Sequence, residues 1–186
     1  RDSTMGKKRL SASERFLYPV PCILVTCGKK NPNIVTIAWT GIICSDPPQV
    51  YISIRPTRHS YGIIKKEGIF GINMPTASMV DKVDICGTVS GKNADKFKLC
   101  NFSVFYGEVT GVPLIMECPI NIECEVINEL PCGVHNMFIG KVVNIYADEN
   151  YKPTIDSLQP IAFLPFSSEY STLGEVVGRY GFSKKK

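Results

Sequence analysis

The sequence predicts a mainly β (α+β) protein, an antiparallel barrel or sandwich with short helical insertions. Three observations lead to this class. Short runs rich in β-branched and apolar residues recur along the chain, Gly, Pro and Asn separate them, and few segments have helical spacing. The chain has 186 residues, 44% of them hydrophobic, which suits one domain with its own core.

Strands and turns are expected to alternate in the first part of the chain. Residues 22–27 predict a buried strand, residues 28–33 a turn and residues 34–39 the return strand. After a break at residues 46–48 (DPP), residues 49–55 predict a strand with regular alternation. One face of that strand carries Val50, Ile52 and Ile54, and the other carries Gln49, Tyr51 and Ser53.

Two short helices are expected next, with a short strand between them. Ser60 is the predicted N-cap of a helix over 60–67, and the strand covers 69–73. The second helix is predicted over 78–86, with Gly87 as its stop signal. The apolar side chains at helical spacing in this second helix are Met79, Val83 and Cys86.

The second half of the chain returns to strands. Residues 92–101 predict a polar loop or a helical turn, and residues 120–126 a half-exposed strand. A turn over 130–133 leads to a long strand over 134–147, and residues 161–164 predict a short edge strand. The expected solvent face of 120–126 carries Asn121, Glu123 and Glu125, and the expected apolar face of 134–147 carries Met137, Ile139, Val143 and Ile145.

The distribution of charge argues against a nucleic-acid partner. The net charge is +4, but seven of the 21 basic residues lie near the two ends. Without those seven and Asp2, 14 basic residues face 16 acidic ones, whereas nucleic-acid binding needs a basic stripe on the folded body. No apolar run approaches the roughly 18 residues of a membrane span, and no signal-peptide pattern occurs. We therefore expect no membrane partner and a cytoplasmic location.

The eight cysteines indicate neither a metal site nor a disulfide framework. No two of them have C-x-x-C spacing, and the chain has only two histidines, so we expect no bound metal. Free thiols in a reducing compartment fit a long, core-rich chain better than disulfides do. Cys22, Cys27 and Cys124 lie in apolar runs and are expected in the core.

The segment Arg55–Ser60 (RPTRHS) is the strongest candidate for a binding site. It joins a predicted strand to a predicted helix start and places guanidinium and hydroxyl groups beside free helix N–H groups, which suits a phosphate. In the alternative interpretation, Ser60 is only a cap and Arg58 only a surface charge.

The sequence assigns no catalytic residue. It contains no dinucleotide-binding glycine pattern, phosphate loop or serine-hydrolase elbow. Cys132 and His135 place a thiol near an imidazole, but neighbours on one turn seldom have the geometry of a catalytic pair.

The order of several motifs resembles the flavin reductase-like family and, within it, the flavoredoxins. The matching segments are 21–26, 33–39, 46–48, 58–60, 71–73, 91–97, 119–124 and 133–142. The resemblance implies an antiparallel six-stranded Greek-key split barrel with short helical insertions. It also implies a single FMN-binding domain over 1–186, with 1–15 and 181–186 as flexible tails. A homodimer with FMN at the subunit boundary is implied as well.

The same resemblance implies which residues contact FMN. The flavin ring and ribityl chain would be lined by Asn33, Thr36, Ala38 and Trp39, and the phosphate would be held by Ser53, Arg58 and Ser60. Further contacts would come from Cys44, Lys96 and His135, and from an aromatic ring near the C-terminus, Phe166 or Tyr170. Lys96 and His135 could tune the flavin, because a positive group beside it stabilises its reduced anionic form. The alternative roles are a core position for Trp39, a solvated loop position for Lys96 and an ordinary strand position for His135.

Three functions stay open at this point. The first is an electron carrier with tightly held FMN that works between redox protein partners. The second is an NAD(P)H-dependent flavin reductase that releases reduced flavin, and the third is a split-barrel binding protein without redox activity. Whether the protein is an enzyme therefore stays open too.

Overall fold

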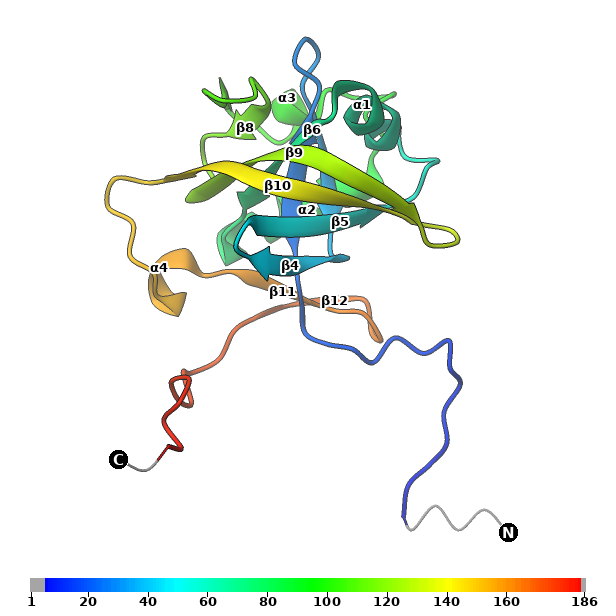
Figure 1. Ribbon diagram of the computed structural model, residues 1–186, viewed down its shortest axis with the longest axis vertical. Coiled ribbons are helices and arrows are strands. Elements are labelled where there is room, and N and C mark those ends of the chain that lie inside the picture. The colour runs from blue at the N-terminus through cyan, green and yellow to red at the C-terminus, as the bar shows by residue number, and fades with distance from the viewer. Residues whose placement is uncertain (1–5, 185–186) are drawn as a thin grey trace.

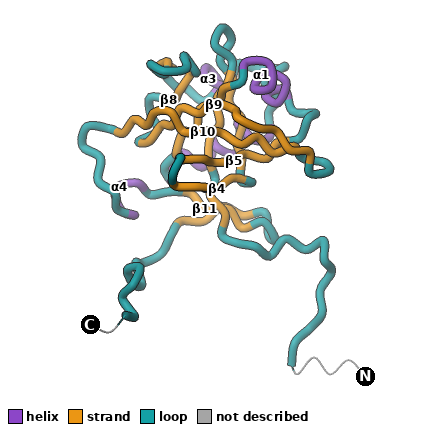
Figure 2. The backbone as a smooth tube through the Cα atoms, viewed as in Figure 1, coloured by secondary structure: helices purple, strands orange, loops and turns teal. Residues whose placement is uncertain are grey.

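Strands dominate the computed structural model, which describes residues 6–184 (Figures 1 and 2). One curled antiparallel sheet has the strand order β3-β2-β6-β9-β10-β5-β4. Its strands are β2 (Ile23–Cys27), β3 (Asn33–Ile37), β4 (Thr40–Ser45), β5 (Pro48–Ile54), β6 (Ile69–Met74), β9 (Ile120–Pro131) and β10 (Asn136–Ala147). The predicted mainly β class and the split barrel are confirmed. The sheet has seven strands rather than six, because β4, which the sequence did not predict, pairs with β5 at one end.

Two smaller sheets complete the β structure. β1 (Val20–Pro21), β11 (Ile161–Leu164) and β12 (Glu169–Thr172) form a three-stranded sheet, and β7 (Val104–Tyr106) pairs with β8 (Pro113–Ile115). The strand predicted over 161–164 exists, but its predicted edge position is wrong. It is the central strand of its sheet, because β1 and β12 pair with its two sides.

Within the described part of the chain, four short α-helices lie between the strands: α1 (His59–Glu67), α2 (Val80–Thr88), α3 (Lys96–Leu99) and α4 (Ile155–Leu158). A 3₁₀ turn, η1 (Ala77–Met79), precedes α2.

Two predicted helix boundaries are wrong. Arg58 rather than Ser60 is the N-cap of α1, and Ser60 lies buried inside the first turn. Gly87 does not end α2, which runs on to Thr88. The reason for a glycine there is close packing, since a Cβ at Gly87 would lie 3.2 Å from the Cβ of Thr36 on β3.

Two hydrophobic clusters pack on the opposite faces of β2. One lies inside the curl of the main sheet and includes Val25, Ile52 and Phe138. The other lies beneath α2 and α3 and includes Leu24 and Val83. The expected burial of three cysteines is confirmed, with Cys22, Cys27 and Cys124 at most 1% exposed. Burial raises the pKa of each of these three thiols to about 12, so none of them is a thiolate at neutral pH.

The predicted solvent face of β9 is mostly wrong. Asn121 and Glu123 are 4% and 0% exposed, and only Glu125 lies at the surface as expected. The turn that joins β7 to β8 covers Glu123. Its carboxylate accepts bonds from the Thr110 amide and hydroxyl, both at 2.7 Å, and from the Tyr146 hydroxyl at 2.8 Å. Both faces of β9 are therefore covered over residues 120–124, and Glu125 and most of the following residues are exposed or half-buried. In the covered part, the alternation separates a polar packed face from an apolar packed face and does not separate solvent from core.

The predicted apolar face of β10 is also wrong. Phe138 and Val142 pack in the barrel core, whereas Ile145 is 59% exposed. Phe138 and Val142 lie on the strand face opposite to the predicted one. Both faces are rich in apolar residues, so the alternation could not indicate which of them is buried. The predicted turn over 130–133 lies two residues later, closed by a bond from the Cys132 amide to the His135 carbonyl at 2.8 Å.

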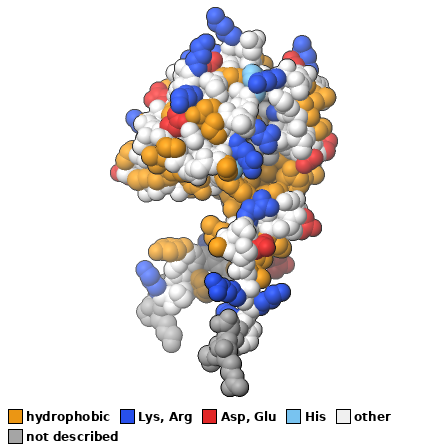
Figure 3. Space-filling view, turned by 90° about the vertical axis from the view of Figure 1, so that its right-hand side faces the viewer, with side chains coloured by type: hydrophobic (Ala, Val, Ile, Leu, Met, Phe, Trp, Pro, Cys, Tyr) orange, Lys and Arg blue, Asp and Glu red, His pale blue; other side chains and the backbone are white. Residues whose placement is uncertain are grey.

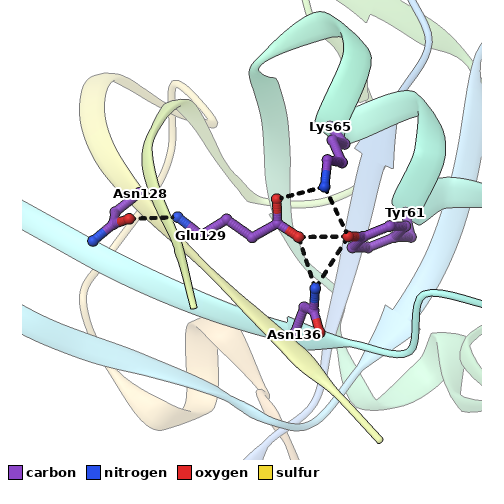
Figure 4. A network of polar contacts seen from close by, with 5 residues as sticks. All are labelled: Tyr61, Lys65, Asn128, Glu129 and Asn136. Carbon is purple, nitrogen blue, oxygen red and sulfur yellow. Dashed lines mark hydrogen bonds and ion pairs between the residues drawn. The ribbon is translucent and has the colours of Figure 1, made fainter. Parts of the chain in front are cut away.

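A polar network fastens the β9–β10 hairpin to α1 (Figure 4). Tyr61 donates to the Glu129 carboxylate, and Asn136 donates to the same carboxylate oxygen at 2.8 Å. Lys65 forms an ion pair with Glu129 at 3.2 Å. The hairpin turn that carries His135 therefore keeps a defined position relative to the helix that follows Arg58.

The two terminal segments leave the body at its lower end in Figure 1. Residues 7–19 and 173–184 contain no helix or strand. The flexibility of 1–15 and 181–186 stays a prediction, and residues 1–5 and 185–186 lie outside the described residues. Figure 3 shows hydrophobic side chains gathered along the lower edge of the body, where these segments depart. No helix within residues 6–184 combines the length and apolar character that crossing a membrane requires.

Candidate functional site

A cavity of about 290 Å³ lies at the N-terminal end of α1. β5 ends just before it, and the chain turns through Thr57 and Arg58 into the helix. The opposite wall comes from the segment between α2 and α3. The lining residues are Val35, Arg55, Thr57, Arg58, His59, Ser60, Val89, Ser90, Gly91 and Lys96. The first-turn amides of a helix lack intrahelical partners, so this junction offers N–H donors as well as side chains.

Lys96 supplies a buried positive charge at this cavity. The residue is 3% exposed, and its ammonium donates to the carbonyls of Ile34 and Cys86 at 2.7 and 2.8 Å. Burial lowers its pKa, and Arg58 nearby acts in the same direction. Within residues 6–184 Lys96 forms no ion pair with a carboxylate. A desolvated cation without a counter-ion favours an anionic ligand, and the solvated-loop interpretation of Lys96 is wrong.

Ser60 is held in a defined orientation by Asn33 at the start of β3. The Asn33 amide donates to the Ser60 hydroxyl oxygen at 2.7 Å, and the two residues are 5% and 2% exposed. Because that oxygen accepts from Asn33, the hydroxyl proton of Ser60 is free to be donated to a ligand. The close contact needs glycine at position 91, where a Cβ would lie 2.2 Å from the Asn33 side-chain oxygen.

A second cavity of about 390 Å³ lies beside Trp39. Ala38, Trp39 and Ser53 line it, and the N-terminal segment at Phe16 and Leu17 covers part of it. The Ser53 amide donates to the Trp39 carbonyl at 2.8 Å, so Ser53 lies with Trp39 rather than with Arg58 and Ser60.

His135 lies next to this second cavity. Its ring centroid is 6.5 Å from that of Trp39. Partial burial lowers the pKa of His135, and Arg55 nearby lowers it further. His135 is therefore mainly neutral at pH 7 and supplies little of the positive charge that the flavin-tuning role asks for.

β3 connects the two cavities. It is the end strand of the main sheet, so one of its edges has no strand partner there. Its five residues span about 13 Å. Asn33 at its first position belongs to the phosphate end, and Trp39 lies two residues beyond its last position. The free backbone groups of an edge strand suit an elongated ligand with polar ring atoms.

Four other predicted contacts lie outside both cavities. Thr36 donates to the Val83 carbonyl and packs against α2. Cys44 on β4 donates to the Asp46 carbonyl at 3.3 Å. Phe166 stacks on Phe16, with ring centroids 5.3 Å apart. Tyr170 donates to Asp84 at 2.9 Å.

Sequence reasoning assigned no binding role to His59, Ser90 and Gly91, all of which line the phosphate cavity; the hydroxyl of Thr57, which also lines it, belonged to the predicted phosphate segment. His59 belongs to the segment already chosen for phosphate binding, and Gly91 begins the matching segment 91–97. Ser90-Gly91 follows a predicted helix, and a Ser-Gly pair there is a loop signal that could have drawn attention to it. Within residues 6–184, no three His, Cys, Asp or Glu side chains are grouped so that they could hold a metal ion.

The donor set of the first cavity fits the phosphate of a flavin nucleotide. A guanidinium, a desolvated ammonium, a free hydroxyl proton and helix N–H groups converge there, and within its lining no carboxylate opposes them. A split barrel whose edge strand leads from such a phosphate cavity to an aromatic pocket defines a flavoprotein-type fold.

The comparisons identify the family. The model of the flavin reductase like domain matches residues 14–170, and the chain belongs to the flavin reductase-like family. The structure is similar to the flavoredoxin of Desulfovibrio vulgaris (Miyazaki F), with a TM-score of 0.88 and 32% identity over 96% of this chain and 100% of that one. Flavoredoxin from Methanosarcina acetivorans has the same TM-score and 31% identity, over 95% of this chain and 96% of that one.

A third relative is a reductase component. The chain is 26% identical over 116 residues to that component of the 4-nitrophenol 4-monooxygenase/4-nitrocatechol 2-monooxygenase of Rhodococcus opacus. The match covers 62% of this chain and 59% of the relative.

Proposed function

We propose that this protein is an FMN-binding electron carrier of the flavoredoxin type. The observation that carries the proposal is the cavity at the N-terminus of α1, where Lys96 is a buried cation without a carboxylate partner among the described residues. Similarity to two flavoredoxins over almost the whole chain supports the same function. Bound FMN supplies one- and two-electron transfer.

The chain's own residues have separate tasks in this proposal. Arg58 and Lys96 neutralise the phosphate, and Ser60 donates its free hydroxyl proton to a phosphate oxygen. Asn33 orients Ser60. The edge of β3 offers backbone groups to the polar rim of the flavin ring, and Trp39 gives that ring an aromatic neighbour that excludes water.

The subunit arrangement and location are also proposals. A homodimer with FMN at the subunit boundary is consistent with the partly open pocket at Trp39 and with exposed apolar side chains such as Ile42, which is 83% exposed. A reducing compartment such as the cytoplasm suits eight free cysteines. A redox protein would be the electron-transfer partner.

The main alternative is an NAD(P)H-dependent flavin reductase that releases reduced flavin. The likeness to a monooxygenase reductase component favours it. The two functions differ in how tightly the protein binds flavin and in whether it oxidises NAD(P)H. A split-barrel binding protein without redox activity is the third possibility.

A visible spectrum of the purified protein, taken after incubation with FMN and desalting, tests the proposal. We expect oxidised-flavin bands at about one FMN per chain. Arg58→Ala should weaken FMN binding roughly ten- to hundredfold, because charge-assisted hydrogen bonds contribute about 1.5–3 kcal/mol. Arg179→Ala, in the exposed C-terminal segment, is the matched control and should bind FMN normally.

The same preparation separates the alternatives. NAD(P)H oxidation that rises with added free flavin would establish the reductase in place of the carrier. If the protein retains no FMN and oxidises neither NADH nor NADPH, the result supports the third function, a split-barrel binding protein without redox activity.

A further inference from the structure

Two cysteines of the hydrophobic cluster beneath α2 and α3 have their sulfur atoms in contact. The Sγ atoms of Cys86 and Cys100 are 3.7 Å apart, and the two residues are 0% and 3% exposed. Cys86 lies in the last turn of α2, and Cys100 is the C-cap of α3, so the pair connects two helix ends. Both are free thiols in this structure. A disulfide bond needs about 2.05 Å between its sulfurs, so an approach of roughly 1.7 Å would join them.

The chain between these two cysteines forms the wall of the phosphate cavity that faces α1. Residues 89–91 and Lys96 lie in it and line the cavity. The end of α2 also holds two cations of the cavity. The Lys96 ammonium donates to the Cys86 carbonyl at 2.8 Å, and the Arg58 guanidinium donates to the Gly87 carbonyl at 3.4 Å. A covalent link at Cys86 would therefore restrain the segment that positions both cations.

The two thiols differ in their access to a small oxidant. Cys100 follows Leu99, which is 52% exposed, at the end of a four-residue helix, whereas Cys86 is completely covered. Helix ends open locally more readily than a packed core, so an oxidant reaches Cys100 first. Burial raises the pKa of Cys86 to about 12, and the neighbouring Cys100 acts in the same direction. Because the thiolate is the reactive form, the pair reacts slowly at neutral pH and responds to sustained oxidation.

We propose that hydrogen peroxide joins Cys86 and Cys100 in a disulfide bond that restrains this wall of the phosphate cavity. The Cys100 sulfur first attacks a peroxide oxygen, the O–O bond breaks, one water leaves and Cys100 becomes a sulfenic acid. The Cys86 sulfur then attacks the Cys100 sulfur, so that the S–S bond forms, the S–O bond breaks and a second water leaves. The two thiols lose two electrons and two protons, and the peroxide is reduced to water. A dithiol reductant restores both thiols.

The expected effect of this bond on flavin binding rests on the proposed function. The bond closes a short loop and limits the motion of the cavity wall, while Lys96 and Arg58 keep their carbonyl partners. Ordering a site before the ligand arrives lowers the free-energy cost of binding. We therefore expect the oxidised protein to bind FMN about threefold or more tightly than the reduced protein. Trypsin cleavage after Lys92, which is exposed in the same segment, should become slower.

Peroxide treatment of the full chain, followed by removal of the peroxide, tests the pair. Peptide mapping with trypsin and chymotrypsin, without reductant, should find residues 86 and 100 in two peptides joined by a disulfide. Dithiothreitol should separate these peptides. Fluorescence titration gives the Kd of FMN before and after oxidation, and a short trypsin digestion gives the cleavage rate at Lys92.

Cys100→Ala is the test variant, and it should lose the joined peptides and both effects of peroxide. Cys86→Ala should give the same result and takes its place if Cys100→Ala does not fold. Cys118→Ala is the matched control, because Cys118 is also 0% exposed in the same hydrophobic cluster. In the described part of the chain its sulfur contacts no other cysteine sulfur, so this variant should respond to peroxide as the wild type does.

Three results would overturn the proposal. The first is a peroxide-treated wild type without the joined peptides. The second is a joined pair that leaves the FMN affinity unchanged or lowers it. The third is an equal effect of peroxide on the wild type and on Cys100→Ala, since the effect would then come from another oxidised residue.

Failure of the proposed function would be distinguishable from failure of the disulfide. If the reduced wild type binds no FMN, the proposed function fails, and the peptide map and the cleavage rate at Lys92 still test the bond. Joined peptides with slower cleavage would then support the proposal. An unchanged cleavage rate would overturn it.

Discussion

At the scale of single residues, the phosphate cavity depends on polar groups that have lost their water. Lys96 and Ser60 are almost completely buried, yet each keeps hydrogen-bonding capacity for a ligand. Lys96 uses two of its three ammonium protons on backbone carbonyls. Such preorganised donors bind an anion without first being desolvated or reoriented, which lowers the free-energy cost of binding.

The sequence predicted which chemical groups line this cavity but not whether they are buried or solvated. The segment Arg55–Ser60 indicated a phosphate site from its guanidinium and hydroxyl groups alone. Burial of Lys96 was not predictable, because lysine is usually solvated. In the buried state the ammonium is held by the carbonyls of Ile34 on β3, 62 residues from Lys96, and of Cys86 on α2, 10 residues from it.

Gly91→Ala tests the close contact at residue scale. The added Cβ must displace the Asn33 side chain, which breaks its bond to Ser60, so FMN affinity should fall about tenfold for a loss of about 1.4 kcal/mol. Fluorescence titration with FMN measures the change. Gly62→Ala is the control, because a Cβ there meets no atom within 4 Å. That control should stabilise α1 by about 0.5–1 kcal/mol and keep wild-type affinity. Unchanged affinity in Gly91→Ala would show that Asn33 does not orient Ser60 for the ligand.

At the scale of elements, the strands whose faces were predicted wrongly are those that pack on both sides. β9 is covered by the barrel core on one face and by the β7–β8 turn on the other. Period-two alternation identifies a strand and its two faces, but it does not tell which face meets water when polar side chains are buried by hydrogen bonding. The strand at residues 49–55 was predicted correctly because its Ile52 and Ile54 face the core, as the pattern indicates.

Glu123→Gln tests the buried network that joins β9 to β10 and to the turn at Thr110. Burial alone would raise the pKa of Glu123, but hydrogen bonds from Thr110, Tyr146 and Val109 lower it on balance. A lowered pKa in the folded state stabilises the protein above the unfolded pKa, and this contribution is lost as pH falls through the folded pKa. At pH 7 the variant should be less stable by about 1–3 kcal/mol, because an amide cannot accept all of these bonds.

Thermal or urea unfolding between pH 3 and pH 7 measures that effect. The difference between wild type and Glu123→Gln should narrow below the ordinary glutamate pKa of 4.5. Glu125→Gln, two residues further along β9, is the control; its side chain is exposed, so the change should affect stability little. A constant difference at every pH would mean that the network does not depend on the charge of Glu123.

At the scale of the whole molecule, the lower edge of the body is apolar and lies next to the pocket at Trp39. β4 is the end strand there, and Ile42 on it is 83% exposed (Figure 1). Leu17, in the N-terminal segment that lines the same pocket, is 88% exposed. Exposed apolar groups gathered at one edge are typical of surfaces that another chain covers.

Ile42→Glu tests the proposed homodimer. We expect light scattering after gel filtration to give twice the 20.6 kDa chain mass for the wild type and a single chain mass for the variant. A charge buried in the subunit boundary is costly, so dissociation and weaker FMN retention should occur together. Ile145→Glu is the control, because Ile145 is also exposed, at 59%, but lies on β10 away from β4. A monomeric wild type that still retains FMN would separate flavin binding from dimerisation.

The class of fold, most strand positions and the residue types of the phosphate site could be predicted from the sequence. These features follow from local rules: β-branched runs favour strands, Gly and Pro end them, and a helix start beside Arg and Ser attracts an anion. The order of its motifs was specific enough to indicate the family.

Which strand faces are buried, and which of the predicted site residues lie together, could be seen only in the folded chain. Ser53, on β5, lines the cavity beside Trp39, whereas Arg58 lies beyond the end of β5, at the N-cap of α1, and lines the phosphate cavity. Glu123 is shielded from solvent because the turn at Thr110 packs over its carboxylate. The burial of a side chain and its contacts with other residues depend on segments that are far apart in sequence. A local sequence pattern does not tell which segment will pack against it.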